Sequence, residues 1–430
     1  MRIGTVGVIG LGYIGLPTAA VLAAKGVKVV GVDVNPSTVE AINRGDVPFV
    51  EPDLAAYVSG AVQHGMLRAS AAPEPADAFI VAVPTPFRGD HEPDESFIEA
   101  AAAAVAPVLN GGELVILEST SPPGATRRMA EAILAARPDL SLDGSGGRPR
   151  IHVAHCPERV LPGRVMIELV TNDRIVGGLT PEAATRAKDL YAVFCQGEIL
   201  LTDAVTAEMA KLVENSFRDV NIAFANELSL IADKLDIDVW ELIRLANHHP
   251  RVNILQPGPG VGGHCIAVDP WFIVDADPDH ARLIRTAREV NDDKPRWVVD
   301  QVVAAVRQAG ARSVSLFGLA FKPNIDDLRE SPARQIVAAV ADRLPDVHVL
   351  VAEPHVDELP PELANRRNVT LVTTDAAAHK GDVLVDLVAH GVFREYRDQG
   401  STQATANKVV LDFTGAGAAT AERRPITLTA

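Results

Sequence analysis

The sequence predicts an α/β protein with two doubly wound parallel sheets joined by a long central helix. Short β-branched runs alternate with Ala- and Leu-rich helical patterns towards both ends of the chain, and that alternation is typical of parallel sheets covered by helices. Between them, residues 204–235 keep a helical period without Gly or Pro. The 430 residues leave room for about two to four domains. We expect three, at residues 1–202, 203–308 and 309–430.

Composition narrows the class of protein. The formal net charge of −16 argues against non-specific binding to nucleic acid or to an anionic membrane, because both need a basic surface. No apolar run approaches the ~20 residues of a membrane span, and the first strand-like residues are too few for a signal peptide. The three cysteines, Cys156, Cys195 and Cys265, fit reduced thiols better than a disulfide framework. We therefore expect a cytoplasmic protein.

A dinucleotide-binding pattern opens the chain. A predicted strand is followed directly by Gly10, Gly12 and Gly15 in the spacing Gly-x-Gly-x-x-Gly, and then by a helical pattern. These glycines allow a tight turn, a close approach of the backbone to a pyrophosphate, and packing of the helix on the sheet. A second strand at 27–32 ends in Asp33, whose carboxylate would accept from a ribose 2′-OH and repel a 2′-phosphate. The pattern predicts a Rossmann-like domain that binds NAD rather than NADP.

Further polar residues follow the next strands of this domain. The runs that read as strands are 78–83, 113–118 and 151–154. Ligands of an open parallel sheet bind outside the carboxyl ends of its strands, so Thr85 and Thr120 are placed to contact cofactor or substrate, although turn capping alone would also explain them. Glu158 and Arg159 follow the third run and could meet a reacting group and an anion. We interpret Cys156 as a core residue.

The long helix at 204–235 carries a polar stripe. Lys211, Asn215 and Arg218 are spaced i, i+4 and i+7 and so share one face. A solvated stripe is the simplest explanation. The alternative is chemical, because a lysine and an asparagine are what an oxyanion beside a thiol needs. The helix itself is expected to connect domains, to form a dimer interface, or both.

A glycine-rich loop delivers one thiol. Gly258, Gly260, Gly262 and Gly263 precede Cys265 and let the backbone press against a ligand. Asp269 follows four residues later, close enough on a helical turn to face the same pocket. The two interpretations are a tight loop with a buried cysteine and a candidate nucleophile.

No metal site is expected. His248 and His249 are adjacent, but no HExxH motif or CxxC pair accompanies them. His264 and Cys265 are likewise adjacent rather than spaced as tetrahedral ligands normally are.

The last third repeats the α/β pattern without the glycine fingerprint. Two helices, at 279–291 and 296–308, lead into a strand at 313–317, and further strand runs follow. No Gly-x-Gly-x-x-Gly follows the first strand, so a second dinucleotide of the same kind is not expected. Lys322 and Arg329 lie past the carboxyl end of that strand and suit a diphosphate, with a solvated loop as the alternative.

Several stretches taken together resemble one known family along nearly the whole chain. They are Gly10-Leu-Gly-Tyr-Ile-Gly-Leu-Pro17, Val83-Pro-Thr-Pro86, Glu118-Ser-Thr-Ser121, Cys156-Pro-Glu-Arg159, Lys211-x-x-x-Asn215, Gly262-Gly-His-Cys265 with Asp269, and Phe317-Gly-Leu-Ala-Phe-Lys322. The family is that of the UDP-glucose/GDP-mannose dehydrogenases. Members that act on UDP-glucose commonly carry Gly-Gly-x-Cys-x-Pro-Lys-Asp, whereas this chain has Gly262-Gly-His-Cys-Ile-Ala-Val-Asp269. In that respect it resembles the branch that acts on N-acetylated sugars.

The resemblance implies an NAD-dependent four-electron oxidation of a sugar C6 hydroxyl to a uronate, for surface polysaccharide precursors. The expected substrate is a UDP-N-acetylated hexosamine, UDP-N-acetyl-D-mannosamine first and UDP-N-acetylglucosamine as the alternative. Cys265 would form a thiohemiacetal and then a thioester. Lys211 and Asn215 would stabilise oxyanions, and either Asp269 or Glu158 would be the base for the hydrolytic water.

The resemblance also implies binding roles for further residues. Tyr13, Ile14 and Thr120 join the glycines, Asp33 and Thr85 on the cofactor side, and Thr120 is also a catalytic candidate. The substrate-binding candidates besides Lys211 and Asn215 are Arg159, Val160, Arg218, His249, Arg251, Gly262, Phe321, Lys322 and Arg329. Arg251 would reach in from the partner subunit of a homodimer.

Two rival functions remain open. One is a two-electron dehydrogenase of the hydroxy-acid or 6-phosphogluconate type, which needs a lysine and no thiol. The other is a non-catalytic NAD-binding module, which predicts no turnover.

Overall fold

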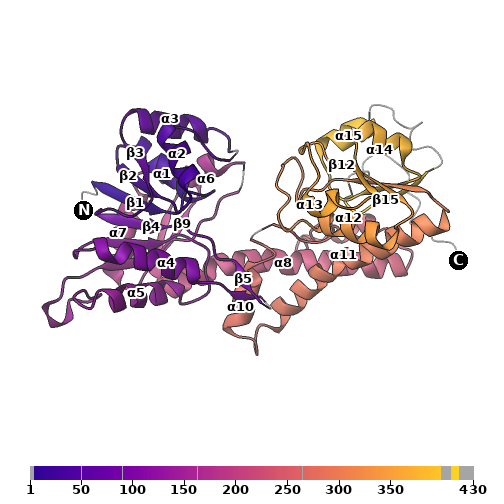
Figure 1. Cartoon of the computed structure of the whole chain (residues 1–430). Coiled ribbons are helices and arrows are strands. Elements are labelled where there is room, and N and C mark those ends of the chain that lie inside the picture. The colour runs from indigo at the N-terminus through magenta and orange to yellow at the C-terminus, as the bar shows by residue number, and fades with distance from the viewer. Residues whose placement is uncertain are drawn as a thin grey trace. The chain divides into compact units, whose positions relative to one another are not determined.

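Two compact units make up the chain (Figure 1). The first comprises Met1–Glu214 with Asp275–Pro278, and the second comprises Asn215–Val274 with Asp279–Ala430. The structure is a computed structural model that describes residues 4–49, 51–89, 91–161, 163–263, 265–398 and 408–415. Among these residues, no helix combines the length and the apolar character needed to cross a membrane.

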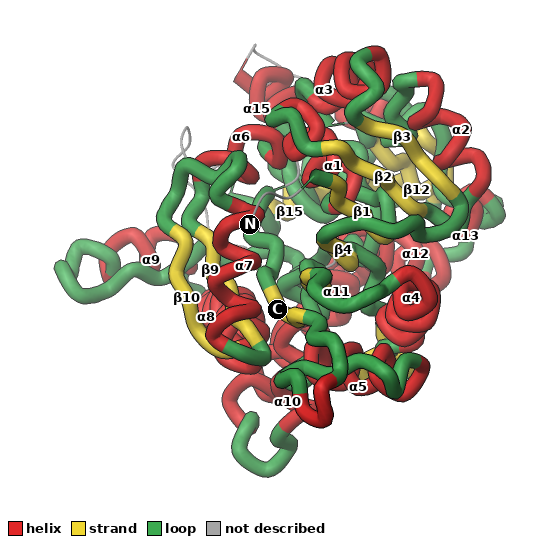
Figure 2. The backbone as a smooth tube through the Cα atoms, turned by 90° about the vertical axis from the view of Figure 1, so that its left-hand side faces the viewer, coloured by secondary structure: helices red, strands yellow, loops and turns green. Residues whose placement is uncertain are grey.

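The first unit is built on an eight-stranded sheet in the order β10-β9-β8-β7-β4-β1-β2-β3. Its strands are β1 (Thr5–Ile9), β2 (Lys28–Val32), β3 (Leu67–Ser70), β4 (Ala78–Val81), β7 (Leu114–Leu117), β8 (His152–His155), β9 (Arg174–Gly178) and β10 (Ile199–Asp203). In Figure 2, β1, β2 and β3 lie side by side, in agreement with their parallel pairing. Strand β9 pairs antiparallel with β8, so the predicted parallel sheet holds except at that pair. The strand order reverses between β1 and β4, where ligands of such sheets bind.

Helices cover both faces of this sheet. They are α1 (Gly15–Ala24), α2 (Pro36–Arg44), α3 (Leu54–Gln63), α4 (Ser96–Val105), α5 (Ala125–Ala136), α6 (Val165–Thr171) and α7 (Pro181–Tyr191), with short 3₁₀ turns at Ala106–Val108 and Ser145–Gly147 and a hairpin of β5 (Phe87–Arg88) and β6 (Glu92–Pro93). Alternate residues of β4 enter two different cores. Ile80 packs in the core that includes α1 and α3, and Phe79 packs in the core that includes α4 and α5. This two-sided burial explains the nearly continuous apolar strands.

The second unit repeats the central strand order of the first. Its parallel sheet runs β13-β12-β11-β14-β15, with β11 (Ser313–Phe317), β12 (His348–Ala352), β13 (Val369–Leu371), β14 (Val383–Asp386) and β15 (Val409–Asp412). The N–H of Gly318 donates to the carbonyl of Ala352 at 2.8 Å, just as Gly10 donates to Val32 at 2.8 Å, and both glycines have positive φ. The first turn of a Rossmann unit is therefore kept here without the rest of its fingerprint.

The remaining helices of the second unit flank this sheet or precede it. They are α9 (Val239–Ala246), α10 (Asp269–Ala276), α11 (Arg282–Gln308), α12 (Pro332–Arg343), α13 (Pro361–Ala364), α14 (Thr374–Lys380) and α15 (Gly391–Asp398). Helices α11 and α12 pack on one face of the sheet, and α14 and α15 contribute to a smaller core on the other. The two helices predicted at 279–291 and 296–308 are one helix, α11, that continues through Pro295.

The long helix α8 (Ala204–Lys234) confirms the helix predicted from 204–235. Its second half lies beside α11 (Figure 1), and buried polar contacts join the two helices. The Arg288 guanidinium binds the Asp219 carboxylate at 2.5 Å, and both side chains are fully buried. Lys294 donates to Ser229 at 2.5 Å and lies 3.8 Å from the centre of the Trp297 ring. These contacts explain how α11 stays helical at Pro295, because packing offsets the hydrogen bond that a proline cannot donate.

Candidate active site

The glycine turn of the first unit has two glycines that the fold needs and one that it does not. A Cβ on Gly10 would lie 2.4 Å from the carbonyl oxygen of Ala82, and one on Gly15 would lie 1.9 Å from the carbonyl oxygen of Gly10. Gly12 has no described atom within 4 Å of the place of its Cβ. The chain itself gives no reason for glycine there, and a ligand that approaches the backbone would.

The start of α1 suits an anionic ligand. Ile14 occupies the N-cap position without a capping side chain, and the first turn holds no acidic residue. Backbone N–H groups and the helix dipole are therefore available to phosphate oxygens. Asp33 accepts from the N–H of Leu11 at 3.0 Å, and Tyr13 stacks on Phe49 with ring centres 4.3 Å apart. The turn, the helix start and the carboxylate fit the pyrophosphate and ribose of NAD.

The loops after β4 and β7 are joined by hydroxyl groups. Thr85 donates through Oγ1 to the carbonyl of Thr120 at 2.6 Å, and Ser119 donates to the carbonyl of Val83 at 2.7 Å. Thr85 thus has a structural role whatever else it contacts. Thr120 is half-buried at the carboxyl end of β7.

Glu158 and Lys211 are both buried in the first unit, and the charge of Lys211 acts on the Glu158 carboxyl. Burial raises the pKa of the Glu158 carboxyl, while the positive charge of Lys211 and the N–H of Val160 oppose that shift. The Val160 N–H donates to the Glu158 carboxylate. A carboxyl with a raised pKa beside an ammonium group can exchange protons with a reacting group.

Arg159 is engaged by protein groups in this structure. Its guanidinium binds Glu214 through two contacts, at 2.5 and 3.1 Å, and also donates to the carbonyl of Asp173 at 3.2 Å. A substrate anion at Arg159 would have to compete with Glu214.

Glu118 and its partners form a buried polar cluster in the first unit, and residue spacing did not reveal it. Glu118 is fully buried at the end of β7, where it accepts from Thr18 and Tyr191, both at 3.2 Å, and lies 3.6 Å from Arg174. Burial raises its pKa to about 7, against the charge of Arg174. Cys156 is confirmed as a core residue, because it is fully buried and burial raises the pKa of its thiol to about 11.

The second unit exposes the thiol of Cys265. The carbonyl of Cys265 accepts from the N–H of Asp269 at 2.8 Å, so one helical turn joins the thiol to the first residue of α10. The amide of Asn215 donates to the buried Asp269 carboxylate at 2.5 Å. The structure therefore excludes the alternative of a buried cysteine and brings Asn215 and Asp269 together.

The glycines before Cys265 allow close packing against the loop that follows β11. A Cβ on Gly262 would lie 2.4 Å from the carbonyl oxygen of Glu330, and one on Gly263, where φ is +86°, would lie 2.9 Å from the Phe321 ring. Larger residues could not occupy either position without a shift of backbone or ring. The cysteine loop and Phe321 are thus parts of one packed structure.

A cavity of about 180 Å³ opens beside these residues, past the carboxyl ends of β11 and β14. It lies where the strand order of the second sheet reverses, which is where such sheets bind ligands. Its lining includes Gly258, Gly260, Phe321, Lys322, Val388 and Thr414. The Lys322 ammonium, 5.8 Å from the centre of the Phe321 ring, supplies a positive charge. Arg329 is not among the lining residues and forms an ion pair with Asp327 at 2.6 Å.

The remaining predicted site residues differ in burial. On α8, Lys211 and Asn215 are buried, whereas Arg218 is exposed, so a solvated stripe describes only the last of the three. His249 and Arg251 are exposed on the loop after α9. That loop is held by Asn247, whose amide bonds with both the N–H and the carbonyl of Ile254.

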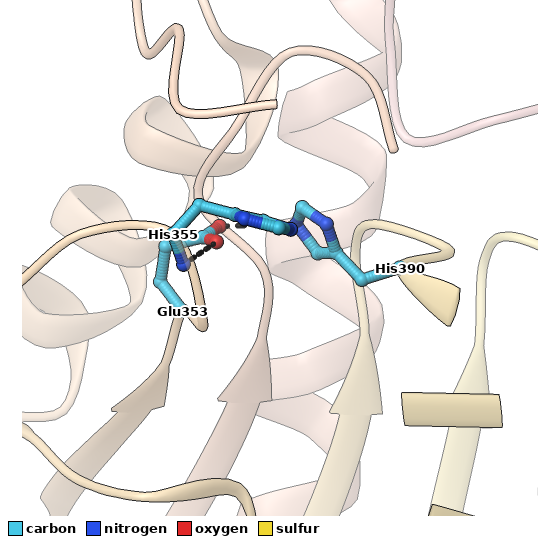
Figure 3. Close-up of side chains that lie close together, drawn as sticks. All are labelled: Glu353, His355 and His390. Carbon is cyan, nitrogen blue, oxygen red and sulfur yellow. Dashed lines mark hydrogen bonds and ion pairs between the residues drawn. The ribbon is translucent and has the colours of Figure 1, made fainter. Parts of the chain in front are cut away.

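One group of side chains in the described parts of the chain could hold a metal ion by distance alone. Ligand atoms of Glu353, His355 and His390 lie within 4.8 Å of one another (Figure 3). The N–H of Asn324 donates to Nδ1 of His390 at 2.9 Å, so the ring proton is assigned to Nε2, which donates to Glu353 at 3.1 Å. Both nitrogens of His390 are engaged, and neither offers a lone pair to a metal.

Comparisons with known proteins give matches along most of the chain. Models of the UDP-glucose/GDP-mannose dehydrogenase family match residues 4–195 (NAD binding domain), 205–293 (central domain) and 315–417 (UDP binding domain).

Two curated relatives and one solved structure illustrate the similarity. A UDP-N-acetyl-D-mannosamine dehydrogenase of Escherichia coli (strain K12) is 58% identical over 403 residues, 92% of this chain and 95% of the relative. An NDP-N-acetyl-D-galactosaminuronic acid dehydrogenase of Ralstonia nicotianae is 57% identical over 412 residues, 96% of each chain. The structure of the UDP-N-acetyl-mannosamine dehydrogenase Cap5O from Staphylococcus aureus superposes with a TM-score of 0.83 at 40% identity, covering 96% of this chain and 95% of the other.

Proposed function

The chain belongs to the UDP-glucose/GDP-mannose dehydrogenase family, and from that premise we propose that it oxidises UDP-N-acetyl-D-mannosamine to UDP-N-acetylmannosaminuronate. It is an NAD-dependent nucleotide-sugar dehydrogenase. The exposed thiol of Cys265, one helical turn from an Asp269 carboxylate that Asn215 holds, is the observation that carries the proposed chemistry. The product would serve the synthesis of surface polysaccharide precursors.

The names of close relatives support the choice of sugar. A chain 58% identical acts, by its name, on UDP-N-acetyl-D-mannosamine. A second candidate sugar follows from the relative that is 57% identical and is named for an N-acetyl-D-galactosaminuronic acid. UDP-N-acetylglucosamine remains the alternative that the sequence suggested.

The proposed reaction is a double oxidation at C6 of the sugar. Bound NAD supplies an acceptor for hydride. Lys211 would take the proton of the C6 hydroxyl in its neutral form, and the resulting ammonium group stabilises the developing oxyanion. The product of this first step is an aldehyde. The Cys265 sulfur then bonds to the aldehyde carbon, and the resulting thiohemiacetal keeps that carbon on the protein.

The second oxidation converts the thiohemiacetal into a thioester. The hydroxyl proton of the thiohemiacetal goes to a protein base, and its hydride passes from the same carbon to a second molecule of NAD. Water then adds to the thioester carbonyl, the carbon–sulfur bond breaks, and the thiol and a carboxylate are released. Asn215 stabilises the oxyanion of that addition, and either Asp269 or Glu158 accepts the proton of the water.

The binding residues divide between cofactor and substrate. We assign Gly10, Gly12, Gly15, Asp33 and the helix start at Ile14 to NAD, with Tyr13, Thr85 and Thr120 beside them. Lys322 and Phe321 are assigned to the UDP half of the substrate through the cavity that they line. The remaining substrate candidates are Arg159, Val160, Arg218, His249, Arg251, Gly262 and Arg329.

We further propose a cytoplasmic homodimer with domains at 1–202, 203–308 and 309–430. Helix α8 exposes Phe217, Phe224 and Ile231, spaced seven residues apart and 70%, 52% and 48% exposed. Such a spacing keeps apolar side chains on one face, which suits a helix of a second copy. Arg251, exposed on the loop after α9, would then reach the partner's substrate.

A substrate panel tests the proposed function. The purified chain is given UDP-N-acetylmannosamine, its N-acetylglucosamine and N-acetylgalactosamine counterparts, UDP-glucose and GDP-mannose, each with NAD and with NADP. NADH formation should be fastest with UDP-N-acetylmannosamine and NAD. Faster turnover of another sugar nucleotide would show that the proposed substrate is wrong. If no sugar nucleotide were turned over, a non-catalytic NAD-binding module would be favoured.

A further inference from the structure

The loop that follows β11 supplies the groups that face the nucleotide cavity. Residues 318–324 turn away from the end of the strand, and Phe321 and Lys322 at its centre line the cavity. The Phe321 ring also lies against the place of a Cβ on Gly263, in the cysteine loop. The position of this one loop therefore shapes the cavity, and its Phe321 ring also packs against the cysteine loop.

Both ends of the loop are held by two buried side chains. Oε2 of Glu353, directly after β12, accepts from the N–H groups of Leu319 and Ala320 at 2.7 and 3.1 Å. At the other end, Nδ1 of His390 accepts from the N–H of Asn324 at 2.9 Å. The two side chains are joined by the bond from Nε2 of His390 to Glu353 (Figure 3).

Two further features hold the ends of the loop: the backbone conformation of Asn324 and the charge of Glu353. Asn324 has a φ of +62°, which few non-glycine residues adopt, and its side chain accepts from the N–H of Gly391 at 2.8 Å. Burial opposes ionisation of Glu353, yet its hydrogen bonds from His390 and the loop hold the pKa of the carboxyl below its ordinary value. A charged carboxylate that accepts several N–H groups is a strong anchor.

The first unit has a carboxylate at the position that corresponds to Glu353, but that carboxylate has a different role. Asp33 lies at the same place in its sheet, directly after the second strand, and also accepts from a backbone N–H of the first turn. Asp33 is only partly buried, in the position that contacts a ribose in this fold. Glu353 is buried beneath His390 and is not accessible to a ribose hydroxyl. The second sheet thus uses the corresponding carboxylate to fix a loop.

We propose that Glu353 and His390 are positioning residues for the UDP half of the substrate. They hold residues 318–324 in the conformation that presents Lys322 and Phe321 to the nucleotide and packs Phe321 against the cysteine loop. The inference rests on the proposed function, since it takes UDP as the ligand of this cavity. Neither side chain lines the cavity, and both hold the loop through its backbone N–H groups, so we expect their main effect on binding rather than on chemistry.

Three substitutions test the role of the pair. His390→Phe keeps a buried ring and removes both hydrogen bonds. His390→Gln keeps one acceptor for Asn324 and one donor for Glu353, so it is the conservative variant. His355→Ala changes the exposed neighbour in the same cluster and keeps the backbone N–H that donates to Glu353, so it serves as the matched control.

Binding of UDP alone is measured by calorimetry, and thermal unfolding of each variant followed by circular dichroism is the control for folding. His390→Phe should raise the Kd for UDP and the KM for the UDP-sugar by at least about tenfold, with kcat within about threefold of the wild type. His390→Gln and His355→Ala should stay within about threefold in all three quantities. If His390→Phe does not fold, Glu353→Gln, which loses one of the acceptor oxygens, is measured in its place.

Two results would overturn the proposal. One is an unchanged Kd for UDP in folded His390→Phe, and the other is a His390→Gln variant as weak as His390→Phe. A wild-type protein that turns over no sugar nucleotide but still binds UDP would refute the proposed function alone, because the binding comparison could still be made.

Discussion

At the scale of single residues, the pair most closely tied to the chemistry is Asn215 with Asp269. Their hydrogen bond of 2.5 Å joins the long helix to the first turn of α10, and it orients a carboxylate one turn from Cys265. A buried carboxylate that loses such a donor changes both its orientation and its charge balance. The amide is also the proposed oxyanion donor.

We predict that Asn215→Ala lowers kcat by about 10²- to 10³-fold, the usual effect of removing one oxyanion donor. The KM for the UDP-sugar should change less than kcat, since an oxyanion donor acts most strongly on the charge that develops during the reaction. Asn221→Ala is the matched control, because the Asn221 amide bonds with a carbonyl of its own helix, that of Phe217. A kcat within about threefold of the wild type for Asn215→Ala would remove this role.

Glu118 is the residue from which a pH effect on stability follows. Its pKa is about 7 in the folded protein, against an ordinary value of 4.5. The folded state therefore holds this proton more tightly than the unfolded chain does. The contribution to stability is complete below pH 4.5 and is lost as the pH rises through 7.

We predict that Glu118→Gln removes this loss, because an amide does not ionise. The difference in unfolding free energy between variant and wild type should move by about 3 kcal/mol in favour of the variant between pH 4.5 and 8. Urea unfolding at several pH values measures it. Glu99→Gln, at an exposed carboxylate of the same unit, should show no such trend. A difference that does not change with pH for Glu118→Gln would contradict the account.

At the scale of elements, the turn between β1 and α1 separates glycines required by the fold from a glycine required by the ligand. Gly15→Ala would place a methyl group on the carbonyl of Gly10, whereas Gly12→Ala would place it in open space. The same substitution should therefore act on different properties at the two positions.

We predict that Gly12→Ala unfolds at nearly the wild-type temperature but binds NAD at least about tenfold more weakly, because the methyl group meets the pyrophosphate. Gly15→Ala should lower the stability by about 1–3 kcal/mol or prevent folding. Thermal unfolding and NAD titration measure the two effects. If Gly12→Ala bound NAD normally, the pyrophosphate would not lie where we place it.

The elements also show how much of the fold could be predicted from the sequence alone. The glycine fingerprint, Asp33 and the period of residues 204–235 are local signals, and the structure has β1, α1, β2 and α8 where they predict them. Pro295 suggested a break between two helices, but packing of its neighbours against α8 keeps α11 continuous. Tertiary contacts of this kind leave no trace in local spacing.

Tertiary contacts also explain why the sequence did not predict two buried clusters. Glu118 is visible at the end of a strand run, but its partner Arg174 lies on β9, a strand that the sequence did not indicate. Glu353 and His390 follow different strands and meet only when β12, β11 and β14 assemble. By contrast, Cys265, Asp269 and Lys322 could be predicted as site residues because short motifs carry them.

At the scale of the whole molecule, the exposed apolar face of α8 predicts the oligomeric state. Phe224→Glu would place a charge in the centre of the proposed interface, and burying an unpaired charge is costly. We predict that this variant is monomeric by light scattering while the wild type is a dimer. Phe97→Glu, at an exposed phenylalanine of α4, should leave the dimer intact. A wild-type monomer, or a dimeric Phe224→Glu variant, would contradict the assignment.

The central claim is that one thiol lets the protein perform two oxidations on the same carbon. The most direct measurement is the number of NADH molecules formed from a limiting amount of the preferred UDP-sugar in excess NAD. The account predicts two per sugar for the wild type and no more than one for Cys265→Ala. One NADH per sugar in the wild type, or two in the Cys265→Ala variant, would contradict it.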